Sequence, residues 1–368
     1  MSFGTVNADV IGTSVAGSNL GAGNASIMKN RLINSDMRID QRNAGASVTG
    51  NDGVYTLDRW LCQTSASSKF TVQQNAGSIT SPIGFTKYLG CTSSSSYSVS
   101  STDFFNIGQP IEGFNWADLN WGTANAKTIT VSAWVYSSLT GTFGGVLNNG
   151  AQNRSYPFLY TISSANTWTQ ISVTIAGDTT GTWTTDNSRS AWLKFSLGTG
   201  STRQGTAGSW SSTLYFGATG ETSVVGTSGA TFYITGVQLE VGEQATGFEY
   251  RIYGTELQNC QRYYNRPFPY QVSLPIGLMN QGAFSVILTL NPPMRTLPSL
   301  DQVAGSLWRF NGYTAGENFA NTWTIGSSQS SGQAIYLNAS AVLTSGNGYA
   351  VTARAYDTTN YLGFSAEL

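Results

Sequence analysis

The chain has 368 residues, of which only 10% are charged, and its 18 lysines and arginines are balanced by 19 aspartates and glutamates. A chain of this length exceeds the size at which one hydrophobic core stops growing, so we expect more than one domain. There is no run of basic residues, so we expect no nucleic-acid partner, and there is no histidine, which removes the commonest general base and metal ligand.

Residues 1–30 are rich in Gly, Ser and Asn and poor in large apolar side chains, so they cannot form a core by themselves. We interpret them as an extended N-terminal arm that becomes ordered on a partner. They also lack the basic and apolar regions of a signal peptide, and no apolar run in the chain approaches the length of a membrane span. We therefore expect a protein that is made in the cytoplasm and does not insert into a membrane.

The central part of the chain has the period-two alternation of β-strands. Asp36, Arg38, Asp40 and Arg42 alternate with Met37, Ile39 and Gln41, which predicts a strand from Asp36 to Arg42 with a charged outer face. Four later segments share this period and lie between Gly, Asn or Ser clusters: ITVSAWVYSS, WTQISVTIAG, AWLKFSLGTG and TFYITGVQLEVG. Such spacing is typical of a jelly-roll β-sandwich. In the last segment the parity of the apolar residues changes at Gly236, which predicts a β-bulge there.

One helix is predicted, over YGTELQNCQRYY at residues 253–264, with Thr255 as its N-cap. Pro267 and Pro269 cannot continue it. Five further strand-like runs follow and predict a small β-sandwich or barrel-like domain. The fold class is therefore all-β, with an N-terminal extended arm (1–30), a central jelly roll ending in a short helix (31–266), and a smaller C-terminal β domain (267–368).

The sequence points to no metal or cofactor. Cys62, Cys91 and Cys260 are too widely spaced for a disulfide scaffold, so we expect reduced, buried thiols. No loop concentrates acidic residues as a calcium loop does, although a structural calcium ion is left open.

Two signatures carry a family resemblance. RLINSDMRIDQRNAG, followed by YTLDRW, and the later GVQLEVGEQATGFEYRIYGTELQNCQRYY resemble the framework of bacteriophage tail-fibre and virion structural proteins. The region between them resembles the jelly rolls of carbohydrate-binding modules. The resemblance implies a homotrimer on the virion, with residues 1–30 contacting other virion proteins. In the second signature, Glu249 and Arg251 are predicted to form a structural ion pair, a subunit contact being the alternative.

Loop aromatics are the candidate binding residues, because flat rings stack on sugars. Their alternative role is to pack over an edge of the sandwich. Two acidic residues lie near them and could hydrogen-bond sugar hydroxyls, or cap their own turns. The candidate carbohydrate-binding set is Phe114, Trp116, Asp118, Trp121, Trp183, Asp186 and Trp210. Tryptophans within strands or at strand ends are assigned to the core: Trp60, Trp134, Trp168 and Trp192.

Three functions follow from these features. The first is a non-enzymatic tail fibre that attaches the particle to host-surface glycan, and the second is a capsid fibre or decoration protein. The third is a carboxylate-dependent polysaccharide depolymerase, which would need two converging carboxylates. No spacing of acidic residues singles out such a pair, and no repeat of fixed period predicts a β-helix, so a non-enzymatic role is preferred.

Overall fold

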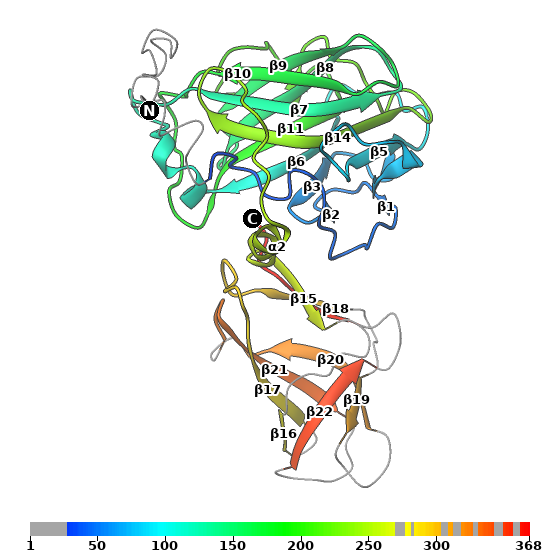
Figure 1. Cartoon of the computed structure of the whole chain (residues 1–368), viewed down its shortest axis with the longest axis vertical. Coiled ribbons are helices and arrows are strands. Elements are labelled where there is room, and N and C mark those ends of the chain that lie inside the picture. The colour runs from blue at the N-terminus through cyan, green and yellow to red at the C-terminus, as the bar shows by residue number, and fades with distance from the viewer. Residues whose placement is uncertain are drawn as a thin grey trace, which may run out of the picture. The chain divides into compact units, whose positions relative to one another are not determined.

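The computed structural model describes residues 28–268, 277–280, 283–302, 308–311, 318–326, 330–341, 349–355 and 361–368. It divides into two compact units, the first ending at Arg251 and the second beginning at Ile252. Nearly all of the regular structure is β (Figure 1), which confirms the predicted fold class. Of the predicted arm at 1–30, only residues 28–30 lie within the described part of the chain.

The first unit contains two six-stranded antiparallel sheets. The first sheet has the order β1 (Val48–Thr49), β4 (Phe70–Gln74), β5 (Leu89–Ser93), β14 (Thr231–Val241), β7 (Ile129–Ser137) and β10 (Thr169–Ile175). The second has the order β2 (Tyr55–Leu57), β3 (Trp60–Thr64), β6 (Phe104–Glu112), β11 (Arg189–Thr199), β8 (Gly141–Asn149) and β9 (Ser155–Ile162). Connecting loops hold the short parallel pair β12 (Gln204–Gly205) and β13 (Gly217–Ala218), and the 3-10 helices η1 (Ala76–Ser78), η2 (Gly113–Asn115) and η3 (Ala117–Leu119).

The core of this unit lies between the two sheets. Alternate residues of each strand enter it, as the period-two pattern predicts: Ile129, Val131, Ala133 and Val135 from β7, and Leu193, Phe195 and Leu197 from β11. Burial of this apolar surface is the main driving force for the fold. The intervening residues of β7, Trp134 and Tyr136, consequently lie on the outer face of the first sheet.

The bulge predicted at Gly236 is confirmed. The register of β14 against β7 shifts between Thr235 and Gln238, and Gly236 has a φ of 59°. This left-handed conformation suits glycine. Because of the bulge, Phe232 and Ile234 enter the core before it, and Val237 and Leu239 enter after it.

The charged strand predicted from Asp36 to Arg42 is wrong, and the segment that leads into it from Arg31 is not a strand either. This segment is irregular, because Asn34 and Met37 have left-handed φ values of 54° and 60°. Leu32, Met37 and Ile39 are all buried, although they do not share one strand parity. The turns direct apolar side chains of either parity inward, which a straight strand cannot do.

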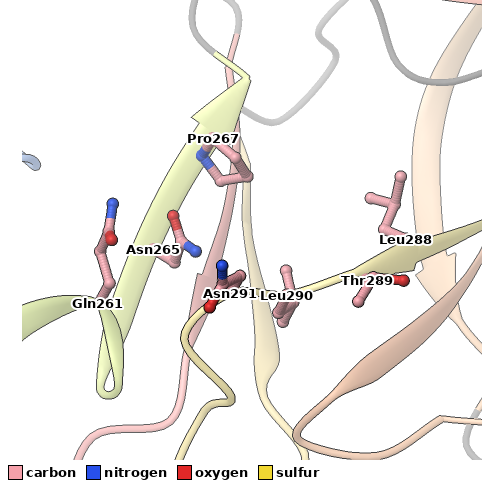
Figure 2. A pocket seen from close by; sticks show the side chains of 7 residues that line it. All are labelled: Gln261, Asn265, Pro267, Leu288, Thr289, Leu290 and Asn291. Atoms are coloured by element: carbon pink, nitrogen blue, oxygen red, sulfur yellow. The ribbon is translucent and has the colours of Figure 1, made fainter. Parts of the chain in front are cut away.

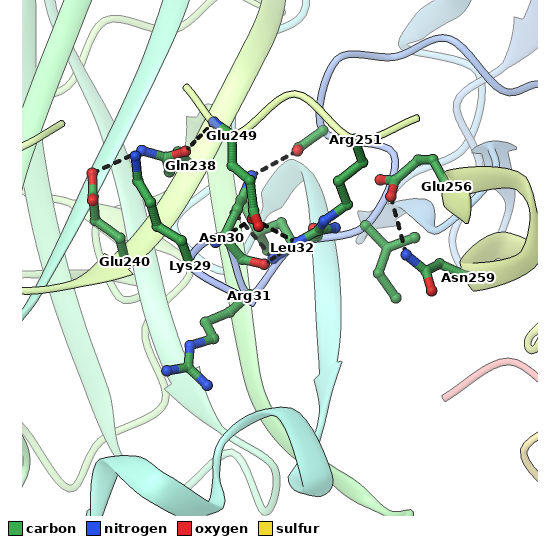
Figure 3. A network of polar contacts seen from close by, with 12 residues as sticks. Lys29, Asn30, Arg31, Leu32, Gln238, Glu240, Glu249, Arg251, Glu256 and Asn259 are labelled. Atoms are coloured by element: carbon green, nitrogen blue, oxygen red, sulfur yellow. Dashed lines mark hydrogen bonds and ion pairs between the residues drawn. The ribbon is translucent and has the colours of Figure 1, made fainter. Parts of the chain in front are cut away.

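Figure 3 shows that the two signatures lie side by side, joined by a polar network. Asn30 donates its backbone N–H to Glu249 at 2.7 Å, and Arg251 contacts the same carboxylate at 3.0 Å. Arg251 also donates to the Leu32 carbonyl at 2.9 Å. The predicted Glu249–Arg251 ion pair is therefore confirmed, and it fixes the N-terminal segment against the chain that leaves β14.

The second unit begins with the helix α2 (Tyr253–Gln261). A three-stranded sheet follows, with the order β15 (Tyr264–Phe268), β23 (Leu362–Ser365) and β18 (Ser299–Gln302). A closed barrel completes the unit, with the order β16 (Gly277–Asn280), β17 (Ala283–Thr289), β21 (Ala334–Ala341), β20 (Asn318–Ile325), β19 (Trp308–Asn311) and β22 (Tyr349–Ala355). A barrel is one of the two forms that the sequence predicts for this part of the chain.

Two predictions about the helix are corrected. The predicted jelly-roll domain includes the helix and ends at residue 266, whereas the structure places α2 in the second unit, which begins at Ile252. Helix α2 packs with β15 of that unit. Its N-cap is Ile252, which makes no side-chain capping bond, and Thr255 lies inside the helix.

Candidate functional site

The four tryptophans of the predicted loop site lie together, but they bury one another. Neighbouring rings of this group have centroids between 4.7 and 5.7 Å apart. Trp116 is 1% exposed, Trp121 and Trp183 are also buried, and Trp210 is half-buried. Stacking on a sugar requires an accessible ring face, so burial contradicts this role for Trp116, Trp121 and Trp183. The alternative interpretation, packing at the edge of the sandwich, describes them.

Hydrogen bonds hold this tryptophan cluster in place. Trp121 donates to the Lys127 carbonyl at 2.7 Å, and Trp210 donates to the Ala176 carbonyl at 2.8 Å. Asp178 accepts two bonds from Arg154, at 2.7 and 2.8 Å, beside the cluster. Burial opposes ionisation of Asp178, but the bonds and charge of Arg154 and the bonds from Thr180 together outweigh it and lower the pKa of this carboxyl. The acid is therefore used structurally.

The other three predicted residues lie at the surface. Phe114 is 59% exposed, and Asp118 forms a two-bond ion pair with Arg31 at 2.7 and 2.8 Å. Asp186 accepts hydrogen bonds from the backbone and hydroxyl of Ser188, which lower its pKa. Asp186 therefore caps its own turn, and within the predicted set Phe114 alone presents a largely exposed ring.

A second group of aromatic side chains lies on the outer face of the first sheet. We define the aromatic face as Tyr88, Trp134, Tyr136, Trp168 and Tyr233. Strand pairing places Tyr233 opposite Tyr136, and Gln170 opposite Trp134. Trp168 immediately precedes β10. The aromatic face therefore extends across neighbouring strands of one sheet.

The aromatic face has a buried base and a more exposed upper layer. Tyr88 and Tyr233 are buried, whereas Trp134, Tyr136 and Trp168 are half-buried. Tyr136 stacks on Tyr233 with ring centroids 5.2 Å apart and planes inclined by 6°. Tyr88 and Trp168 pack against this pair at 5.2 to 5.5 Å. The rings thus hold one another in fixed positions.

Hydrogen bonds to the loop that contains η1 support the base. The Tyr88 hydroxyl donates to the Ala76 carbonyl at 2.6 Å and accepts from the Ile79 N–H at 2.9 Å. Trp168 donates to the Thr80 carbonyl at 2.8 Å. Burial raises the pKa of Tyr88 and of Tyr233, so both phenols stay neutral at physiological pH. The exposed side chains of Gln170 and Ser172 lie on the same side of β10 and add polar groups beside the rings.

Sequence reasoning missed this face, although a signal was present. From the sequence we expect Trp134 and Trp168 in the core, yet both side chains are half-buried. In ITVSAWVYSS, the core residues Ala133 and Val135 directly flank Trp134, so strand parity already directs Trp134 to the opposite face. Trp60 and Trp192, in contrast, are buried as predicted.

Glu221 is an acid with a perturbed pKa on the outer side of the second sheet. Burial raises the pKa of its carboxyl, as a general acid would require. Its two oxygens accept hydrogen bonds from the Ser196 hydroxyl at 2.5 Å and the Ala218 N–H at 3.0 Å. These contacts attach the loop that contains β13 to β11, which gives Glu221 a structural role.

Two other kinds of feature are absent from the residues that the structure describes. There, no group of three or more Cys, Asp or Glu side chains is placed to hold a metal ion. In the same residues, no helix has the length and apolar character needed to cross a membrane.

No family model matches the sequence, and no curated protein matches it. Solved structures with similarity include the enzymatically active domain of tailspike protein 4 from bacteriophage CBA120, at 11% identity and a TM-score of 0.30, covering 58% of this chain and 22% of that one. They include the module TmCBM61 in complex with β-1,4-galactotriose, at 9% identity and a TM-score of 0.29, covering 58% of this chain and 99% of the module. The family 11 carbohydrate-binding module of a Clostridium thermocellum cellulosomal cellulase has 11% identity and a TM-score of 0.25, covering 56% and 100%. At these values, none of the similarities assigns a function to this chain.

Proposed function

We propose that this chain is a non-enzymatic virion protein that binds host-surface glycan through the aromatic face of its sandwich. The observation that carries the proposal is the half-buried layer of Trp134, Tyr136 and Trp168 on an outer sheet face. Aromatic rings provide apolar stacking area, and the indole and phenol edges supply hydrogen bonds.

The arrangement favours binding because the rings are already fixed. Tyr136 and Trp168 pack on the buried Tyr88 and Tyr233, so little side-chain freedom is lost when a ligand binds. Gln170 and Ser172 offer neutral donors and acceptors beside them. A neutral, polar and aromatic surface fits a polyhydroxylated chain better than a charged polymer.

The test is binding of the full chain to polysaccharide from the host surface, with Trp134→Ala and Trp168→Ala as separate variants. Loss of one stacked ring removes about 1.5 kcal/mol, so each variant should bind about tenfold more weakly. Phe114→Ala is the matched control, because it removes an exposed ring from the loop site of the same unit. Loss of binding in Phe114→Ala alone would move the site to the loops, and unchanged binding in all three variants would remove both sites.

For the role on the particle, we rank a tail fibre first and a capsid fibre or decoration protein second. The resemblance of the two signatures to virion proteins supports both, and it also supports a homotrimer attached through residues 1–30. Copurification with tails or with tail-less heads distinguishes the two locations, and the mass of the purified protein in solution tests the trimer.

The non-enzymatic part of the proposal rests on the structural use of Glu221 and Asp178, whose oxygens are already bonded. We expect no new reducing ends when host polysaccharide is incubated with the purified chain. Their appearance would instead favour a carboxylate-dependent depolymerase.

A further inference from the structure

The second unit contains a pocket of its own (Figure 2). Its volume is about 270 Å³, and its lining comes from the end of α2, from β15, and from the end of β17 with the residues that follow it. The lining residues are Gln261, Asn265, Pro267, Leu288, Thr289, Leu290 and Asn291. This volume lies below the usual range for drug-sized ligands, so the pocket suits a smaller molecule.

The described polar side chains of the pocket are uncharged and make no hydrogen bonds within the protein. It consists of the carboxamides of Gln261, Asn265 and Asn291 and the hydroxyl of Thr289. Asn265 is only 4% exposed, and its backbone pairs with Phe364 of β23, which fixes its position. Across the part of the chain that the structure describes, none of these four side chains makes a hydrogen bond within the protein. The carboxamide of Asn265 can therefore offer its N–H donors and its carbonyl acceptor to a ligand or to water in this pocket.

The chemistry of the lining selects a neutral ligand with several hydroxyl groups. Each carboxamide offers N–H donors and a carbonyl acceptor, and can therefore bind a hydroxyl in either direction. Leu288 and Leu290 are buried and, with Pro267, provide apolar surface for C–H groups. Among the described residues, no charged side chain lines the pocket, so nothing in this part of the lining compensates the desolvation of an ionic ligand.

We propose that this pocket binds a single neutral sugar unit. The site is separate from the aromatic face of the first unit, and the proposal does not depend on glycan binding there. It gives the second unit a carbohydrate contact of its own.

The experiment is saturation-transfer difference NMR of the full chain with free glucose, galactose and N-acetylglucosamine as probes, and with glucuronic acid as the charged comparison. We expect at least one neutral probe to bind, and glucuronic acid to bind no more tightly. Gln261→Leu should weaken that binding about fivefold, the value of one hydrogen bond, and Asn265→Leu should abolish it.

The controls separate this site from the proposed function. Gln333→Leu removes an exposed carboxamide of the same unit outside the pocket and should bind like the wild type, as should Trp134→Ala. If no neutral probe binds, or if Gln261→Leu binds the probe as tightly as the wild type, the proposal is overturned. Gln261→Leu decides the matter should Asn265→Leu fail to fold. Loss of binding in Trp134→Ala with full retention in Gln261→Leu would assign the sugar to the aromatic face instead.

Discussion

Asn30 connects the N-terminal segment to β14 through every polar group of its side chain. Its Nδ2 donates to the Ser35 hydroxyl at 2.8 Å and to the Val237 carbonyl at 2.9 Å. Its Oδ1 accepts from the N–H groups of Leu32 and Leu239, both at 3.1 Å. The residue is 2% exposed, so water cannot replace these partners.

We therefore expect Asn30→Ala to lower the free energy of unfolding of the first unit by about 2 to 3 kcal/mol, because buried donors and acceptors are left unpaired. Denaturant unfolding followed by tryptophan fluorescence measures the change. Asn125→Ala, at an exposed asparagine, should shift it by less than about 0.5 kcal/mol. Equal effects of the two substitutions would contradict a structural role for the Asn30 bonds.

Lys194 is fully buried on the outer side of β11, with its ammonium group 4.3 Å from the Trp192 ring centroid and 4.6 Å from that of Phe216. The rings favour the charged form. Burial opposes it more strongly, with a further contribution from Arg189, and lowers the pKa of Lys194 well below 10.5.

Lys194→Met should stabilise the protein at pH 7, since methionine fills similar volume without a buried amine. Between the lowered pKa and 10.5, the unfolded state binds a proton that the folded state does not, so wild-type stability rises with pH in this window. The advantage of Lys194→Met should accordingly shrink as the pH is raised from 7 towards 10. A stability difference independent of pH would show that Lys194 titrates normally.

Among the elements, β14 depends on its bulge. Gly236 has a φ of 59°, and a Cβ added to it would lie 2.5 Å from the Phe85 ring. Gly236→Ala combines the left-handed penalty of about 1 to 2 kcal/mol with this overlap, so we expect a loss of about 2 to 4 kcal/mol in thermal or denaturant unfolding.

Gly229→Ala is the matched control for the bulge. Gly229 has a φ of 72° with no atom within 4 Å of an added Cβ, so the substitution tests backbone strain alone. A loss no larger at Gly236 than at Gly229 would show that Phe85 moves away without cost.

The elements predicted from sequence are those that strand periodicity specifies. Alternation in ITVSAWVYSS gives both the core side of β7 and, through Trp134, the side that carries the aromatic face. The bulge at Gly236 could also be predicted, because the apolar residues change from even to odd positions there. Irregular segments could not be predicted in this way. The left-handed turns at Asn34 and Met37 bury side chains at both odd and even positions, and strand periodicity does not indicate such turns.

The loop tryptophans show the same limit at the candidate site. Trp116 and Trp183 lie 67 positions apart in the sequence. Only the tertiary fold brings their ring centroids to a distance of 5.7 Å. Composition marks such residues as either packing or binding. Burial, which decides between the two, depends on contacts that the local sequence does not show.

At the scale of the whole molecule, the two units have separate cores. The core of the first unit extends from Leu32 to Leu239, and a distinct cluster in the second includes Val286, Ile335 and Phe364. Units with independent cores unfold as separate cooperative transitions. We therefore expect two transitions in calorimetry of the full chain.

A fragment of residues 28–251 should retain the first unit's transition within about 4 °C of its value in the full chain, which corresponds to about 1 kcal/mol for a unit of this size. A fragment of residues 46–251 is the decisive comparison. It lacks Leu32 and Met37 of the core and the Asn30 network, so it should melt at a much lower temperature or fail to fold. If the longer fragment is also unfolded, the sandwich depends on the second unit, and the two cores form one cooperative system.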